Sequence, residues 1–185
     1  AKVAIDVEED GSGTVVVTAI LDRDAAARLG DPATALRLDD LRQAGWRIDD
    51  PAQVDGGGLR LVGSRDFASP EQLPGVLDEI GGADGVFRGA ELTIADGFSA
   101  TTYDFTTSVE LTGSLEQFSD PDLAAALGGL PLARSPEELA VEGANDPAAA
   151  RLDVVVDLPG DTPETNGEGR DDTSTWSFSA SSGEP

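Results

Sequence analysis

Hydrophobic and polar residues alternate with a period of two in several parts of this chain. Near the start, Val3, Ile5 and Val7 are separated by smaller or acidic residues. The turn-forming residues 10–13 come next, and the β-branched run 14–20 follows them. Alternating apolar positions on both sides of a glycine-containing turn predict a β-hairpin.

The same period recurs further along the chain, most regularly in residues 98–111. There Tyr103, Phe105 and Val109 fall on one side of the predicted strand, and polar residues fall on the other. Such alternation is typical of a sheet with one solvated face. We expect further hairpins in 46–61 and 87–111, and strands at 152–158 and 176–180. The predicted inner face of the sheet includes Val3, Ile5, Phe105, Val109, Val154 and Val156.

Helix starts are marked by a capping residue followed by proline. Asp or Ser can accept a hydrogen bond from the first helical turn, and proline fits the first helical position. After Ser69, the side chains of Leu73, Val76, Leu77 and Ile80 form an apolar stripe with helical spacing. The pairs that predict helix starts are Asp31-Pro32, Ser69-Pro70, Asp120-Pro121 and Ser135-Pro136; Ser69 with Gln72, and Ser135 with Glu138, also match a capping box.

Hairpins interrupted by helices predict the α+β class, with a largely antiparallel sheet built from successive β-hairpins and helices packed on one face. We expect residues 1–180 to form a single α+β domain, which the family resemblance described below places outside the cytoplasm. Within this domain, 159–170 should be a loop because glycine, proline, threonine and glutamate dominate there. Residues 181–185 are expected to form a disordered tail or tether.

The composition removes many kinds of chemistry. The chain has no histidine, cysteine or methionine, and Lys2 is its only lysine, so a serine triad, a catalytic thiol, a Walker A site and the usual zinc sites are excluded. Its 36 acidic and 12 basic residues give a formal net charge of -24, which disfavours nucleic acid as a partner. We therefore expect a protein that is not an enzyme and uses no cofactor.

Carboxylates remain the residues through which catalysis could occur. Acid pairs at residues 22 and 24, 39 and 40, and 49 and 50 allow a glycosidase or a calcium site. At this density of acids such pairs also arise by chance, and no segment has the spacing of an EF-hand loop. Solvated surface is the default interpretation, with no metal site.

Trp46 and Tyr103 are the candidate ligand-binding residues, because each combines a large apolar surface with a polar tip. The alternative for both side chains is packing in the core. The sequence pattern alone favours core packing for both side chains.

Several segments, taken together in order, resemble the LppM-type lipoprotein domain of mycobacteria and related actinobacteria. The match extends across nearly the whole chain, and no single segment is a catalytic signature. The segments are LDRDAAARLG (21–30), QAGWRI (43–48), RDFASPEQL (65–73), YDFTTSVEL (103–111), LGGLPL (127–132) and DLPGDTPETNG (157–167) followed by Trp176.

The resemblance implies an α+β cell-envelope protein that lies outside the cytoplasm. It would be anchored to the membrane through segments that this chain does not contain, and a lipobox cysteine is absent here. The expected function is non-catalytic binding of an envelope lipid or glycolipid in an apolar cleft by a monomeric domain. A protein-interaction module in envelope assembly or host contact, and a carboxylate-based glycan hydrolase, are the alternatives.

Overall fold

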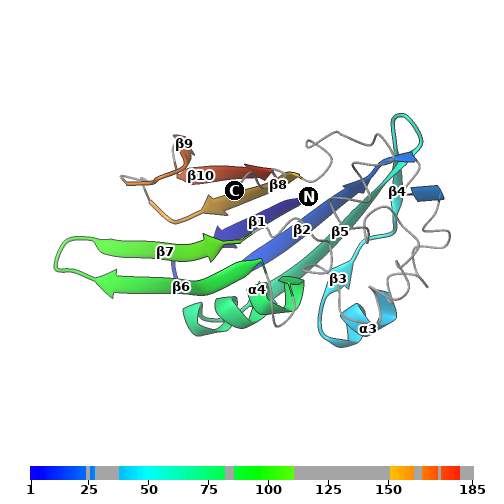
Figure 1. Ribbon diagram of the computed structural model, residues 1–185. Helices are drawn as coiled ribbons and strands as arrows, with labels where there is room; N and C mark the ends of the chain where they lie inside the picture. Colours follow the sequence, from blue (N-terminus) through cyan, green and yellow to red (C-terminus); the bar gives the residue numbers. More distant parts are fainter. Residues whose placement is uncertain are drawn as a thin grey trace.

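The fold consists of a large mixed sheet and a separate two-stranded sheet. The computed structural model describes residues 1–23, 26–27, 38–81, 86–110, 151–160, 164–170 and 172–179 (Figure 1). The eight strands of sheet A are β1 (Lys2–Val7), β2 (Gly13–Leu21), β3 (Arg47–Ile48), β4 (Ala52–Val54), β5 (Gly58–Phe67), β8 (Arg151–Asp157), β9 (Glu168–Arg170) and β10 (Thr173–Ser179). Their order is β3-β5-β2-β1-β8-β10-β9, and β4 also pairs with β5. The mixture of helices and strands confirms the predicted α+β class.

The first hairpin forms as its pattern predicts. β1 and β2 pair antiparallel, with Val3 opposite Val17 and Ile5 opposite Val15. The turn between them is closed by a backbone hydrogen bond from the Gly11 amide to the carbonyl of Glu8, 2.9 Å long. Gly11 has a φ angle of +81°, which glycine adopts without steric cost. The glycines of residues 11–13 therefore serve the turn.

The centre of sheet A differs from the expected antiparallel arrangement. β1 and β8 pair in parallel, with Val3 beside Val154 and Ile5 beside Val156. The other strand pairs of the described sheet are antiparallel. Periodicity identifies which residues share a face but carries no information on strand direction, so the sequence could not predict this pair. The sheet is mixed, so the prediction of a largely antiparallel sheet built from successive hairpins fits only in part. The prediction of helices packed on one face also fits only in part, because the helix after Ser69 contacts the two-stranded sheet as well as β5.

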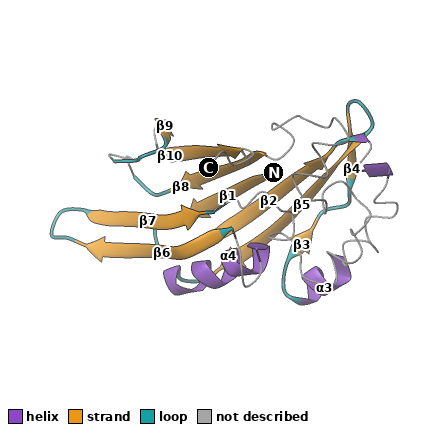
Figure 2. Cartoon of the chain, viewed as in Figure 1, coloured by secondary structure: helices purple, strands orange, loops and turns teal. Residues whose placement is uncertain are grey.

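Helix α4 (Leu73–Gly81) begins after the short 3-10 helix η1 (Pro70–Gln72), as the stripe predicts. The predicted capping box is wrong in detail. The Ser69 side chain makes no capping hydrogen bond, and the Gln72 side chain accepts a hydrogen bond from the Ala68 amide at 3.0 Å. Leu73 and Leu77 are buried in the core. Figure 2 shows α4 along one side of the large sheet.

The second sheet contains two residues that the sequence assigned to the first. β6 (Phe87–Asp96) and β7 (Thr101–Val109) form sheet B, a long hairpin that extends past the edge of the body (Figure 1). Phe105 and Val109 lie on β7, so they do not belong to the inner face of sheet A. Both side chains nevertheless pack against the common core. The alternation correctly predicted that both side chains face the core, but it did not predict the sheet to which they belong.

The remaining predictions have mixed outcomes. The hairpin expected in 46–61 is present as β4 and β5, which meet at residues 55–57, with β3 added beside β5. The expected loop 159–170 contains a strand, β9, which pairs with β10. Helix α3 (Leu38–Gln43) is also present. The predicted helix starts at Asp31-Pro32, Asp120-Pro121 and Ser135-Pro136, and the tail 181–185, lie outside the described residues.

The two faces of sheet A have different characters. One face is apolar and contributes Val3, Ile5, Val15, Leu152, Val154 and Val156 to a core that also holds residues of α4 and sheet B. The opposite face, called here the open face, carries charged and hydroxyl side chains. On it Thr14 lies between Asp6 and Asp66 on neighbouring strands. Candidate sites for apolar ligands therefore lie beside the core face, and candidate sites for polar ligands lie on the open face.

Candidate functional site

Trp46 is placed in the core, just before β3. Its exposed fraction is 7%, and its indole Nε1 donates a hydrogen bond to Glu79 Oε2 on α4 at 2.9 Å. Arg65 on β5 also reaches this carboxylate, with Nη1 3.1 Å from the same oxygen. That contact is an ion pair without hydrogen-bond geometry, since Nη1 is buried and makes no hydrogen bond. The three side chains connect α4 to sheet A.

Tyr103 is half-buried on β7 and has a different set of neighbours. Its hydroxyl donates a hydrogen bond to the backbone carbonyl of Glu9, at 2.7 Å. Its cross-strand partner Ile94 approaches Gly11 in the same turn. The contacts of Tyr103 hold sheet B against the β1–β2 turn, and those of Trp46 connect α4 and β5. Ligand contact by either residue stays a prediction.

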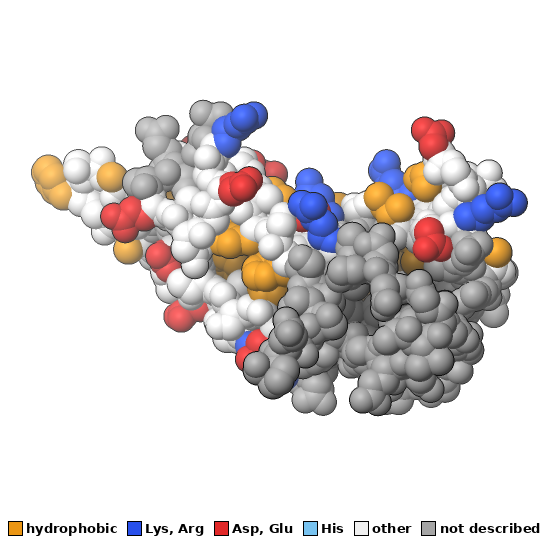
Figure 3. Space-filling model, turned by 45° about the horizontal axis from the view of Figure 1, so that its top comes forward, with side chains coloured by type: hydrophobic (Ala, Val, Ile, Leu, Met, Phe, Trp, Pro, Cys, Tyr) orange, Lys and Arg blue, Asp and Glu red, His pale blue; other side chains and the backbone are white. Residues whose placement is uncertain are grey.

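A group of half-buried apolar side chains borders the core on β7 and on the β8–β10 side of sheet A. These residues pack against the buried cluster but are themselves only partly covered. Figure 3 shows one face of the molecule, where acidic and basic side chains are scattered and small groups of hydrophobic side chains lie between them. We call the half-buried group that borders the core the apolar margin; it consists of Phe105, Val109, Leu158, Trp176 and Phe178.

Trp176 is the largest member of the apolar margin, and its position is fixed from both sides. It lies opposite Val154 on the core face of sheet A. Its indole Nε1 donates to the side-chain oxygen of Asn166 at 2.8 Å. A Cβ on Gly167 would lie only 2.7 Å from the indole and from the Thr175 carbonyl, so glycine is required there. The sequence motif DLPGDTPETNG contains both Asn166 and Gly167, but nothing in it predicted that they contact Trp176.

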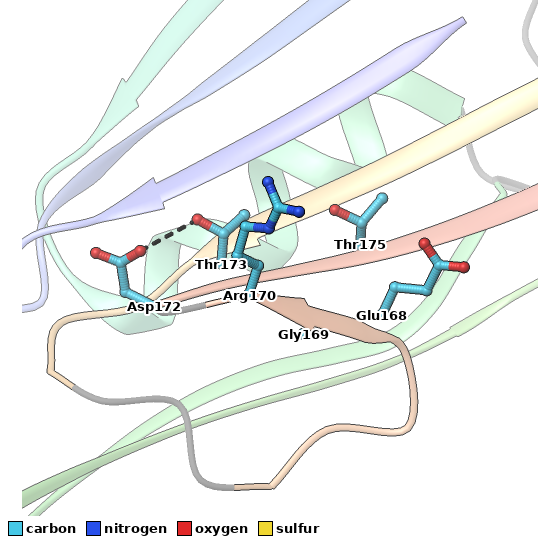
Figure 4. Close-up of a pocket in the computed structure, with 6 residues that line it drawn as sticks. All are labelled: Glu168, Gly169, Arg170, Asp172, Thr173 and Thr175. Carbon is cyan, nitrogen blue, oxygen red and sulfur yellow. Dashed lines mark hydrogen bonds between the residues drawn. The ribbon is translucent and has the colours of Figure 1, made fainter.

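A polar hollow lies beside β9 and β10. It has a volume of about 510 Å³ and is lined by Glu168, Gly169, Arg170, Asp172, Thr173 and Thr175. Figure 4 shows the side chains of Arg170 and Thr173 next to each other, and Glu168 on the side of Thr175. The Thr173 hydroxyl donates to Asp172 at 3.3 Å. A hollow with this lining suits a hydrated polar group and gives no apolar contact to a hydrocarbon.

Asp157 is the described carboxyl group whose pKa is raised. Partial burial is the main cause, and the negative charges of Asp172 and Asp6 add to it. Asp6 lies directly beside Asp157 on the neighbouring parallel strand. A raised pKa is what a general acid needs, but the two carboxyl groups stand side by side on one sheet face and not across a cleft.

Two other carboxylates of the open face are neutralised by arginine. Arg47 binds both oxygens of Asp66, with Nη2 2.7 Å from Oδ1, and Thr14 donates to the same oxygen. These hydrogen bonds lower the pKa of Asp66 to about 2. Asp153 accepts hydrogen bonds from Ser177 and Arg151, which lower its pKa. These charge-assisted hydrogen bonds, bidentate in the case of Asp66, orient the carboxylates and leave them unsuited to proton transfer.

Of the three acid pairs, only Asp49 with Asp50 lies wholly among the described side chains, because Asp24 and the side chain of Asp40 fall outside them. No group of three or more acidic side chains in the described segments is arranged to hold a metal ion. Asp39 instead accepts a hydrogen bond from Arg42 within α3, at 2.9 Å. Among all the described residues, no helix has the length and apolar character needed to cross a bilayer.

Comparisons with protein-family models, with curated proteins and with solved structures give no match for this chain. The resemblance to the LppM-type domain therefore rests on the sequence segments alone, and the function has to be argued from the site.

Proposed function

We propose that this chain is a non-catalytic binding domain of the cell envelope that holds an acyl chain of a lipid or glycolipid. The full-length protein would lie outside the cytoplasm and be tethered to the membrane. The observation that carries the proposal is the apolar margin, in which two large aromatic side chains of β10 are only partly covered. Ligand sites for hydrocarbon are lined mainly by such apolar and aromatic groups.

The fold supports this location for the ligand. Helices on one face of the sheet, together with sheet B, would provide one wall of an apolar cleft, and the core face of sheet A would provide the other. Phe105 and Val109 of sheet B, and Trp176 and Phe178 of sheet A, all pack against the common core and are only partly covered. The net charge of -24 disfavours anionic headgroups at the general surface. Binding would therefore depend on the hydrocarbon and on uncharged sugar or zwitterionic groups.

The two tryptophans provide a direct test. In a Trp46→Phe variant the remaining tryptophan is Trp176, in the apolar margin; in Trp176→Phe it is Trp46, in the core. We expect phosphatidylcholine with a brominated acyl chain to quench the fluorescence of Trp176 strongly and that of Trp46 weakly. Native mass spectrometry after incubation with an actinobacterial lipid extract should show a lipid adduct.

The opposite results would exclude the lipid proposal. If neither tryptophan is quenched and no adduct survives, hydrocarbon does not bind at the apolar margin. Equal quenching of both tryptophans in a protein that has retained its circular dichroism spectrum would place the lipid elsewhere.

The protein-interaction alternative is favoured by a different observation. Phe98, in the turn of the β6–β7 hairpin, is completely exposed, and Ile20 at the end of β2 is 63% exposed. The hydrolase alternative is favoured only by the raised pKa of Asp157. Because its neighbour Asp6 lies on the adjacent strand of a flat face, we prefer the non-catalytic function.

A further inference from the structure

Among the described residues, one backbone edge of β7 has no strand paired to it. β7 pairs with β6 on one side, and sheet B has no third strand among the described residues. On its other side, no backbone hydrogen bond joins residues 101–109 to the rest of the described chain. An unpaired strand edge is a template for another extended chain. β7 lacks the usual protection as well, since Asp104 is its one charged residue and it has no proline.

The inner side of β7 is apolar and incompletely covered. Tyr103, Phe105, Thr107 and Val109 alternate on this side and are all half-buried. A strand added to the edge would place alternate side chains beside Phe105 and Val109. Apolar side chains at those positions would cover the surface that the two residues leave exposed.

The outer side of the hairpin is acidic. Asp104 on β7 lies diagonally across from Glu91 on β6, and both are exposed. Neither carboxylate has an ion-pair partner among the described residues, whereas Arg88 of the same face is paired with Glu110 at 3.1 Å. Positively charged side chains of an added strand would therefore be attracted to this side.

We propose that the free edge of β7 binds an extended peptide segment of a partner protein, with apolar residues facing inward and lysine or arginine facing outward. The alternation of the added strand matches both sides of sheet B. A second copy of this chain fits less well, because each copy carries a net charge of -24 and the two outer sides would repel each other. The peptide would cover Phe105 and Val109, which also belong to the apolar margin, so the two proposed sites overlap at these residues. The peptide proposal rests on the edge of β7 and does not require that an acyl chain binds.

The test uses a synthetic heptapeptide of alternating lysine and valine, acetylated and amidated at its ends. In the free protein, amide hydrogen exchange should be fast at alternate residues of β7. On titration with the peptide, those amides should become protected and their NMR resonances should shift. The same peptide with a central proline, and a peptide of alternating glutamate and valine, should bind at least about tenfold more weakly.

Charge reversal tests the outer side. Asp104→Lys should weaken binding of the lysine–valine peptide by about three- to tenfold. The control Asp55→Lys makes the same change of charge in the turn between β4 and β5, and it should leave the affinity within about twofold. The proposal is overturned if the peptide does not bind, or if both variants bind it equally. Protection of all β7 amides in the free protein would also overturn it, as would self-association through β7 in sedimentation experiments.

Discussion

At the scale of single residues, the open face brings together carboxyl groups with opposite energetic roles. Asp153 and Asp157 project from the same face of β8. Hydrogen bonds to Ser177 and Arg151 lower the pKa of Asp153. Partial burial and two acidic neighbours raise the pKa of Asp157. At neutral pH the ionised form of Asp153 therefore stabilises the fold, and the ionised form of Asp157 destabilises it.

We expect Asp157→Asn to raise the melting temperature at pH 7 by about 1–2 °C and Asp153→Asn to lower it. Both effects on stability should vanish at low pH, but for different reasons. The gain from Asp157→Asn should disappear as the pH falls below about 4, because the wild-type carboxyl is then protonated. The contribution of Asp153 exists above about pH 4 and is lost as the pH falls toward its lowered pKa. Thermal unfolding of both variants between pH 3 and pH 8 would measure this, and equal shifts of the same sign would contradict it.

At the scale of elements, the contact between the β1–β2 turn and sheet B depends on Gly11. An added Cβ at this position would lie 2.6 Å from Ile94 Cδ1. The same residue has positive φ, so a larger side chain meets both a steric and a backbone penalty. The Tyr103 hydroxyl donates a hydrogen bond to the Glu9 carbonyl in the same turn. The β1–β2 turn therefore supports the β6–β7 hairpin through both contacts.

The substitution Gly11→Ala should therefore destabilise the fold by roughly 2–4 kcal/mol. Gly56→Ala is the matched control, because Gly56 has a φ of +86° but nothing within 4 Å of an added Cβ. It should cost only the backbone penalty, about 1 kcal/mol. Adding Ile94→Val to Gly11→Ala removes the clashing methyl group and should restore part of the loss. Urea unfolding at equilibrium measures all three, and equal costs at the two glycines would show that the contact with Ile94 is unimportant.

The strands show how far pattern alone leads. Alternation located β1, β2, β7, β8 and β10, because each buries one side. It missed most of β5, where Gly63 makes room for Trp46 and Ile48, and Arg65 occupies a core-facing position. The candidate residues Trp46 and Tyr103 were chosen by residue type. The partners Glu79 and Glu9 depend on tertiary contacts that no local pattern encodes.

At the scale of the whole molecule, the large negative net charge is the main electrostatic influence on the stability of the fold. A net charge of -24 on 185 residues produces self-repulsion that unfolding relieves. The described arginines offset only part of it, in local pairs such as Arg47 with Asp66.

We expect the melting temperature to rise when sodium chloride increases from about 20 to about 200 mM, because the Debye length shortens from about 20 Å to less than 10 Å. Calcium chloride at matched ionic strength should give the same rise. A flat or falling response to sodium chloride would mean that the acidic groups are already neutralised. An additional rise with calcium would indicate a specific cation site.

The parallel pairing of β1 with β8 also determines when the fold can form during synthesis. The ribosome releases β1 first, but its second neighbour emerges only after about 150 further residues have been translated. Until then the nascent chain exposes one side of β1 as an unpaired edge, and β8 and β10 cannot attach to the sheet. Completion of sheet A is therefore a late event in the synthesis of the chain.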